Sequence, residues 1–72
     1  MKTREMLALL TANKYPMNMI AEQAGVGYFR LYRYIKGTAA MSPDEKAKLW
    51  RFAIMQPLIS EALAIEIEED GK

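Results

Sequence analysis

The chain contains neither cysteine nor histidine among its 72 residues. Without cysteine, no disulfide or thiolate metal site can hold so small a fold together. The fold must therefore rely on its core or on a second chain. Histidine and cysteine are the usual ligands of zinc and common partners in activating a nucleophile, and neither Ser42 nor Ser60 has a base in a recognisable setting. We therefore predict a protein that is not an enzyme and that needs no metal ion or other cofactor.

Long hydrophobic runs are absent as well. No apolar stretch approaches the ~18 residues that argue for a membrane span, and Met1–Arg4 is followed by only a short apolar patch rather than a signal sequence. We expect a cytoplasmic protein with no membrane partner. The lack of cysteine also fits the reducing cytoplasm. Yet 51% of the residues are hydrophobic. This is ample for a helical core, and apolar surface left over from that core favours oligomerisation.

Charge is nearly balanced overall, at +1, but it is unevenly distributed. Residues 1–56 hold nine lysines and arginines against four acids, whereas residues 57–72 hold one lysine against five acids. A basic body with an acidic end would attract DNA at one end and repel it at the other.

Residues 16–37 predict two short helices joined by a tight turn. Apolar residues of the first half recur at helical spacing and fall on one face: Met17, Ile20, Ala21 and Ala24. Gly25 follows at once and suits a left-handed exit from a helix. After Gly27 a second periodic run begins, which Gly37 ends and whose inner face is Leu31, Tyr34 and Ile35. Two helices pinned by such a turn form a helix-turn-helix unit.

Ala21 and Val26 satisfy the packing that this unit needs. A side chain larger than methyl at Ala21 would push two closely crossing helices apart, and Val26 suits a buried plug in the turn. The string Ile-Ala-Glu-Gln-Ala-Gly-Val-Gly-Tyr at 20–28 is similar to the helix-turn-helix of Lac-repressor-type headpieces. It also resembles that of the lambda-repressor-like Cro and repressor family of phages. The resemblance is strong over the middle third of the chain and looser over residues 1–56.

The other segments complete an all-α, compact domain of four to five helices. We expect a first helix capped by Thr3 and a second with Pro16 at its first position. The segment Ser-Pro-Asp-Glu at 42–45 is the clearest helix start in the chain, because it combines a capping box with a proline. We expect this helix to run to about Met55 and to cover the core with Ala47, Trp50, Ala53 and Ile54.

DNA is the ligand expected on the outer face of the second helix of the unit. Such a helix enters the major groove, where its N-terminal half meets base edges and its flanks meet phosphates. Arg33 is the best candidate for a base contact, because an arginine can bond two acceptors of guanine at once. Tyr28 and Phe29 match base-contacting positions of the Lac-type headpiece. Phe29 has no donor or acceptor, so it can only contact a thymine methyl group or stack.

Phosphate contacts are expected around these base contacts. Basic and phenolic side chains suit phosphates, and the amide end of the helix that begins near Asn18 suits another. The predicted DNA-binding residues are Asn18, Tyr28, Phe29, Arg30, Tyr32, Arg33 and Lys36. A protein-docking surface is the alternative for the same face, since tyrosine, phenylalanine and arginine are enriched at protein interfaces.

The C-terminal segment, residues 57–72, begins with a helical pattern that then changes. Residues 65–68 alternate Ile-Glu-Ile-Glu, which fits a strand as well as a frayed helix, and residues 69–72 are expected to be mobile. The segment either completes the monomer core or forms a two-fold interface. We expect the second as at least part of its role, because a palindromic operator needs two recognition helices about 34 Å apart. The interface residues would be Leu58, Ile59, Leu63, Ile65 and Ile67.

These features predict a homodimeric transcriptional regulator of double-stranded DNA, with a DNA-binding domain at 1–56 and a dimerisation segment with an acidic tail at 57–72. The resemblance implies a Cro-like repressor of a phage, prophage or mobile element that blocks polymerase from a palindromic operator. No small-molecule effector is expected, since the chain has no room for an effector domain. The alternative function is that of a protein-binding module, such as a small inhibitor or adaptor.

Overall fold

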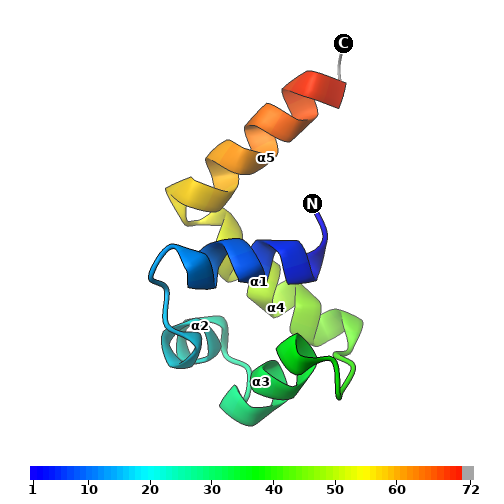
Figure 1. The fold of residues 1–72 in the computed structure, drawn as a ribbon. Coiled ribbons are helices and arrows are strands. Elements are labelled where there is room, and N and C mark those ends of the chain that lie inside the picture. Colours follow the sequence, from blue (N-terminus) through cyan, green and yellow to red (C-terminus); the bar gives the residue numbers. More distant parts are fainter. Residues whose placement is uncertain (71–72) are drawn as a thin grey trace.

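The computed structural model describes residues 1–70, and within that range every regular element is an α-helix (Figure 1). The helices are α1 (Thr3–Ala12), α2 (Met17–Ala24), α3 (Tyr28–Lys36), α4 (Pro43–Ile54) and α5 (Pro57–Asp70). Helices α1 to α4 form the body, and α5 projects from the end of the body that lies opposite α3 (Figure 1). The prediction of an all-α domain of four to five helices is confirmed. Of the end expected to be mobile, Glu69 and Asp70 are the last residues of α5, and Gly71 and Lys72 lie outside the described residues.

The core takes side chains from all five helices and from the loop before α4. Its buried members are Met6, Leu7, Leu10, Ile20, Ala21, Leu31, Tyr34, Met41, Leu49, Ala53 and Ile59. Among the described side chains no charged or strongly polar residue is buried with them. Burial of apolar surface is therefore the main stabilising contribution, as expected for a fold without disulfides.

The start of α4 follows the expectation from the sequence. The Ser42 hydroxyl accepts a hydrogen bond from the Glu45 backbone amide at 3.2 Å, and the Ser42 amide donates to the Glu45 carboxylate at 3.0 Å. Pro43 occupies the first position of the helix. The capping box therefore satisfies amide groups that have no partner inside the helix.

Two expectations about helix starts were wrong. The N-cap of α1 is Lys2 rather than Thr3, and the N-cap of α2 is Pro16, so that Met17 takes the first helical position. The Thr3 hydroxyl instead accepts a hydrogen bond from the Trp50 indole at 3.0 Å. This bond joins α1 to α4 and gives the half-buried indole the partner that its N–H group needs.

The inward face of α4 also differs from the prediction. Leu49 and Ala53 are fully buried, Trp50 is only half-buried, and Ile54 has 51% of its surface exposed. Leu49 and Ala53 lie one helical turn apart, so they set the direction that faces the core, and Ile54 is turned about 120° away from it.

The alternating residues 65–68 are helical, so the strand alternative was wrong. An isolated strand would leave its backbone groups without partners, because the described chain holds no other strand to pair with. A helix satisfies these groups within the segment itself. No helix in residues 1–70 is both long enough and apolar enough to cross a bilayer.

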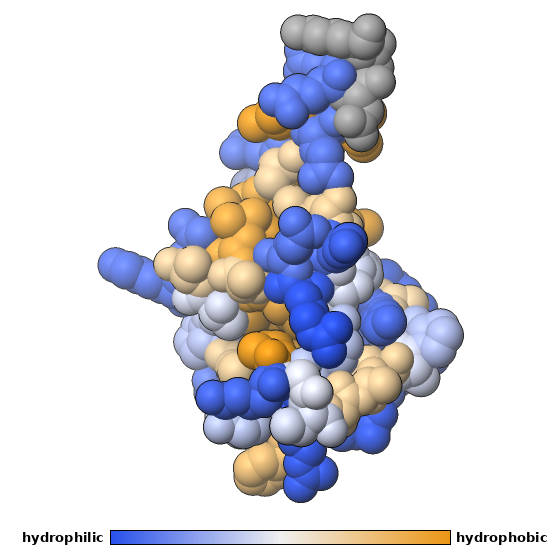
Figure 2. Space-filling view, turned by 45° about the vertical axis from the view of Figure 1, so that its right-hand side comes forward, coloured by the Kyte–Doolittle hydropathy of each residue, from blue (hydrophilic) through white to orange (hydrophobic). Residues whose placement is uncertain are grey.

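The α5 residues assigned to a two-fold interface separate into distinct groups. Ile59 is fully buried in the monomer core, so its assignment to an interface was wrong. Leu58 and Leu63 are partly buried against that core, whereas Ile65 and Ile67 are 59% and 70% exposed. Figure 2 shows hydrophobic surface gathered where α5 joins the body. The first turns of α5 thus belong to the core, and the second half extends beyond it.

Candidate nucleic-acid interface

The turn between α2 and α3 is closed by hydrogen bonds to the last turn of α2. Gly25 has a φ of 78°, in the left-handed region where residues with a Cβ are strained. Its amide donates to the carbonyl oxygens of Ala21 and Glu22 at 2.9 and 3.3 Å, and the Val26 amide donates to that of Ala21 at 3.0 Å. This is the Schellman arrangement for ending a helix, and it gives the chain a defined exit towards α3.

Small and branched apolar residues hold α2 and α3 together. Ala21 is only 3% exposed, and Val26 is partly buried against the core. Helix α2 packs against both α3 and α4. The orientation of α3 is therefore set by the core and not by a loop, which is the condition for presenting side chains precisely.

Helix α3 divides cleanly into a buried side and an exposed side. Leu31 and Tyr34 are buried, and Ile35 lies partly buried beside them. On the exposed side lie Tyr28, Phe29, Arg30, Tyr32, Arg33 and Lys36. The structure thus brings six of the seven predicted DNA-binding residues together on one helix, while Asn18 lies exposed in the first turn of α2.

Arg30 is bound to α4. Its guanidinium donates to both carboxylate oxygens of Glu45, from Nε at 2.6 Å and from Nη2 at 2.7 Å, and to the Ala40 carbonyl oxygen at 3.4 Å. The hydrogen bond from Arg30 is the largest cause that lowers the pKa of Glu45 to about 2, and the same pair raises the pKa of Arg30. Arg30 therefore carries a compensated charge and ties α3 to α4, a role that the sequence analysis missed.

Three exposed aromatic rings form what we call the aromatic ledge: Tyr28, Phe29 and Tyr32. The Phe29 ring meets that of Tyr28 edge to face, with centroids 5.4 Å apart, and the Tyr28 ring stacks on that of Tyr32 at 6.4 Å. Phe29 is 69% exposed, and Tyr28 and Tyr32 are 42% and 40% exposed. The rings support one another without being covered by the rest of the chain.

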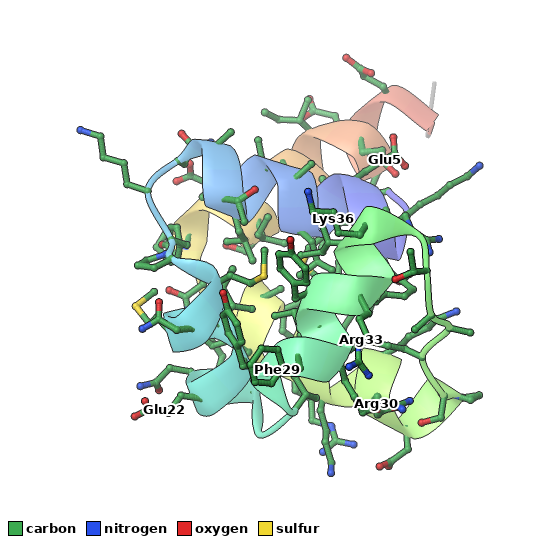
Figure 3. The ribbon with its side chains drawn as sticks, turned by 60° about the horizontal axis from the view of Figure 1, so that its bottom comes forward. Glu5, Glu22, Phe29, Arg30, Arg33 and Lys36 are labelled. Atoms are coloured by element: carbon green, nitrogen blue, oxygen red, sulfur yellow. The ribbon has the colours of Figure 1, made fainter. Side chains whose placement is uncertain are left out.

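Two cations accompany the aromatic ledge. The Lys36 ammonium lies 5.5 Å from the centre of the Tyr32 ring, a cation–π contact. The Arg33 guanidinium makes no hydrogen bond or ion pair with any part of the chain that the structure describes. In Figure 3 the outer face of α3 is turned to the viewer, with Phe29 towards α2 and Arg33 and Arg30 towards α4. Arg33 therefore offers its hydrogen-bond donors to a ligand.

Arg4 anchors the far end of α3 to α1. Its guanidinium lies 4.1 Å from the centre of the Tyr34 ring and donates to the Tyr34 carbonyl oxygen at 3.2 Å. Near the end of a helix a cation is favourable, because the last carbonyl groups carry partial negative charge. No local sequence pattern near Arg4 predicts this contact, because Tyr34 is 30 residues away in the sequence.

The exposed face of α3 thus combines a free arginine, a lysine and three mutually supporting aromatic rings on a rigidly held helix. The resemblance to Lac-type headpieces and Cro-like repressors rests on residues 20–28 and stays a prediction. In comparisons with protein-family models, curated proteins and solved structures, the chain matched none.

Proposed function

We propose that the protein is a sequence-specific regulator of transcription, acting as a repressor, that binds double-stranded DNA through the outer face of α3. The observation that carries the proposal is the arrangement of Arg33 and Lys36 beside the aromatic ledge, on a helix fixed by the tight turn at Gly25. A helix of this kind fits the major groove, and free cations on it match the charge of the phosphates.

The contacts divide the exposed residues of α3 by role. Arg33 has the free planar fork that recognises guanine, whereas Lys36 and Tyr32 suit phosphates on the flank. Arg30 keeps α3 in place through Glu45. It therefore acts as a positioning residue in this proposal, in place of the phosphate contact predicted from the sequence.

Dimerisation through α5 would supply the second recognition helix that a palindromic operator requires. Leu58, Ala62 and Ile65 are spaced four and three residues apart, so they form one stripe along the helix. Ile59 lies on a different side of α5 and is buried in the core. Because residues two apart on a helix are turned about 200° from each other, Ile67 lies away from that stripe. We therefore propose Leu58, Ala62 and Ile65 as the interface with a second copy.

Light scattering in the presence and absence of a pool of random short duplexes tests the DNA proposal. We expect the measured mass to rise with duplex at low salt and to return to that of the free protein at moderate salt. The release reflects counterions that return to phosphates when protein cations leave them. A free mass of two chains supports the dimer, and a mass that ignores duplex at low salt refutes the DNA proposal.

Two matched variants test the dimer. Ile65→Ser should shift the free protein from two chains to one, whereas Ile67→Ser should leave the mass unchanged, because only Ile65 lies on the stripe. An equal effect of both substitutions would contradict the stripe. A single chain before any substitution would contradict the dimer.

A protein-binding module remains the second candidate, and the exposure of Phe29, at 69%, is the observation that favours it. A protein partner held mainly by the aromatic ledge would lose little affinity when salt is added. DNA held by several phosphate contacts would lose much. The salt dependence of binding therefore separates the two functions.

A further inference from the structure

The side chains in the first turn of α3 offer few hydrogen-bonding groups to a ligand. Gly27, its N-cap, has no side chain, and Phe29 has neither a donor nor an acceptor. Arg30 has its guanidinium engaged by Glu45. Apart from the Tyr28 hydroxyl and the Arg30 guanidinium held by Glu45, the side-chain surface of this turn is apolar. In the helix-turn-helix docking mode this is the part of the helix that lies nearest the base edges.

We propose that Phe29 recognises the 5-methyl group of a thymine in the major groove. This inference rests on the proposed function. The thymine methyl is the apolar feature that a base pair presents in that groove, and it is the part of thymine that a phenyl ring contacts favourably. Guanine and adenine present acceptors at N7 that Phe29 would leave unpaired, so contact with them would cost free energy.

The neighbours of Phe29 prepare it for this contact. The Tyr28 ring lies edge to face against it at 5.4 Å and is itself stacked on Tyr32, so the phenyl ring has a fixed support on one side. Its other side is open, as the 69% exposure shows. A ring held in place before binding loses little conformational freedom on binding, which leaves more of the contact energy for recognition.

Arg33 places this thymine relative to the guanine of the proposed function. Phe29 and Arg33 are four residues apart and therefore lie on one side of α3, separated by about 6 Å along the helix axis. Base pairs are about 3.4 Å apart along the duplex. The thymine read by Phe29 should therefore lie one or two base pairs from the base read by Arg33.

Removal of single methyl groups from DNA tests the proposal. Duplexes are first selected with the unaltered protein, and each thymine of the preferred site is then replaced by deoxyuridine, which lacks only the methyl group. We expect the replacement at one position in each half-site to lower the affinity about fourfold, which corresponds to the free energy of burying one methyl group. At that position 5-methylcytosine should bind about fourfold better than cytosine, because its methyl group lies in the same place.

Protein variants then assign the methyl contact to a side chain. Phe29→Ala should abolish the difference between thymine and deoxyuridine, whereas Arg33→Ala should keep that difference while weakening binding as a whole. Phe29 is exposed and lies outside the core, so Phe29→Ala should keep the fold, which circular dichroism checks.

The possible outcomes separate this inference from the proposed function. Specific binding without a methyl-sensitive position, or a methyl effect that survives Phe29→Ala, would overturn the role of Phe29 and leave DNA recognition standing. A protein that binds no duplex at low salt would overturn both. If it instead held a protein partner that Phe29→Ala releases, the aromatic ledge would be a protein-docking surface.

Discussion

Helices α3 and α5 carry most of the large exposed apolar side chains, and they carry them in different arrangements. On α3 the exposed rings lie outside the buried side that holds Leu31 and contact one another, so they form one surface. On α5 the exposed Ile65 and Ile67 lie on different sides of a helix whose second half extends beyond the body (Figure 1). The apolar surface of α3 is thus organised within one chain, whereas that of α5 would be covered only in the proposed dimer.

The largest expected effect separates the two halves of α5. Ile59→Ala removes a fully buried side chain and leaves a cavity, and it should lower the free energy of unfolding by about 2–4 kcal/mol. Ile67→Ala, at the exposed end, should change it by no more than about 0.5 kcal/mol. Urea denaturation at low protein concentration gives both values. Equal losses would show that the whole of α5 packs as tightly as its first turns.

Arg33 tests whether α3, and not α5, recognises DNA. Arg33→Ala should cost about 1–3 kcal/mol of binding free energy on the preferred duplex and should relax one base position. Arg51→Ala on α4 removes the same charge elsewhere on the surface, and Glu68→Gln removes a charge from α5. Both should keep the base preference. Fluorescence anisotropy measures these affinities, and equal losses on all duplexes would reduce Arg33 to a phosphate contact.

Gly25 tests whether the turn before α3 depends on its left-handed backbone. Gly25→Ala should destabilise the fold by about 1–2 kcal/mol because of its φ of 78°, although a Cβ there meets no atom within 4 Å. Gly27→Ala is the matched control. Its φ is −67° and an added Cβ would lie 3.9 Å from the nearest atom, an ordinary contact, so we expect a smaller loss. Thermal unfolding would contradict the strain argument if both variants behaved alike.

The smallest expected effect concerns pH and the bond from α3 to α4. The pKa of Glu45 is lowered from its usual 4.5 to about 2 in the fold. The ionised carboxylate therefore stabilises the fold above about pH 4.5, and this contribution is lost as the pH falls towards 2. Glu45→Gln should lower the melting temperature at pH 6, and its melting temperature should converge with that of the unaltered protein near pH 2. A constant difference across this range would rule out the Arg30 pair as the cause.

Local sequence patterns predicted the helix ends around α3 well, because these patterns depend on residues that are neighbours in the sequence. Gly25 and Gly37 mark the helix ends, and the capping box at Ser42 marks a start, since each acts on backbone groups within a few residues. The candidate site needed more than this. The pairing of Arg30 with Glu45 joins residues 15 apart on different helices, and no periodicity distinguishes Arg30 from Arg33.

The sequence was least informative for α5, where two kinds of information conflicted. The alternation at 65–68 satisfies the period of a strand, but the backbone of a strand needs a neighbour that the described chain does not offer. The burial of Ile59 followed from the way α5 leaves α4 after Gln56 and packs on α1. Spacing alone assigned both Ile59 and Ile65 to the predicted two-fold interface.

By itself the sequence determined that the described chain is helical and where its central turn lies. It also determined which side of α3 is apolar, because period, capping and glycine conformation act over a few residues. Only the tertiary structure decided which charges remain free. It bound Arg30 to Glu45, stacked Arg4 on Tyr34, and left Arg33 beside the aromatic ledge without a partner in the described chain. Such pairings depend on how distant helices pack, and that packing is a property of the whole core.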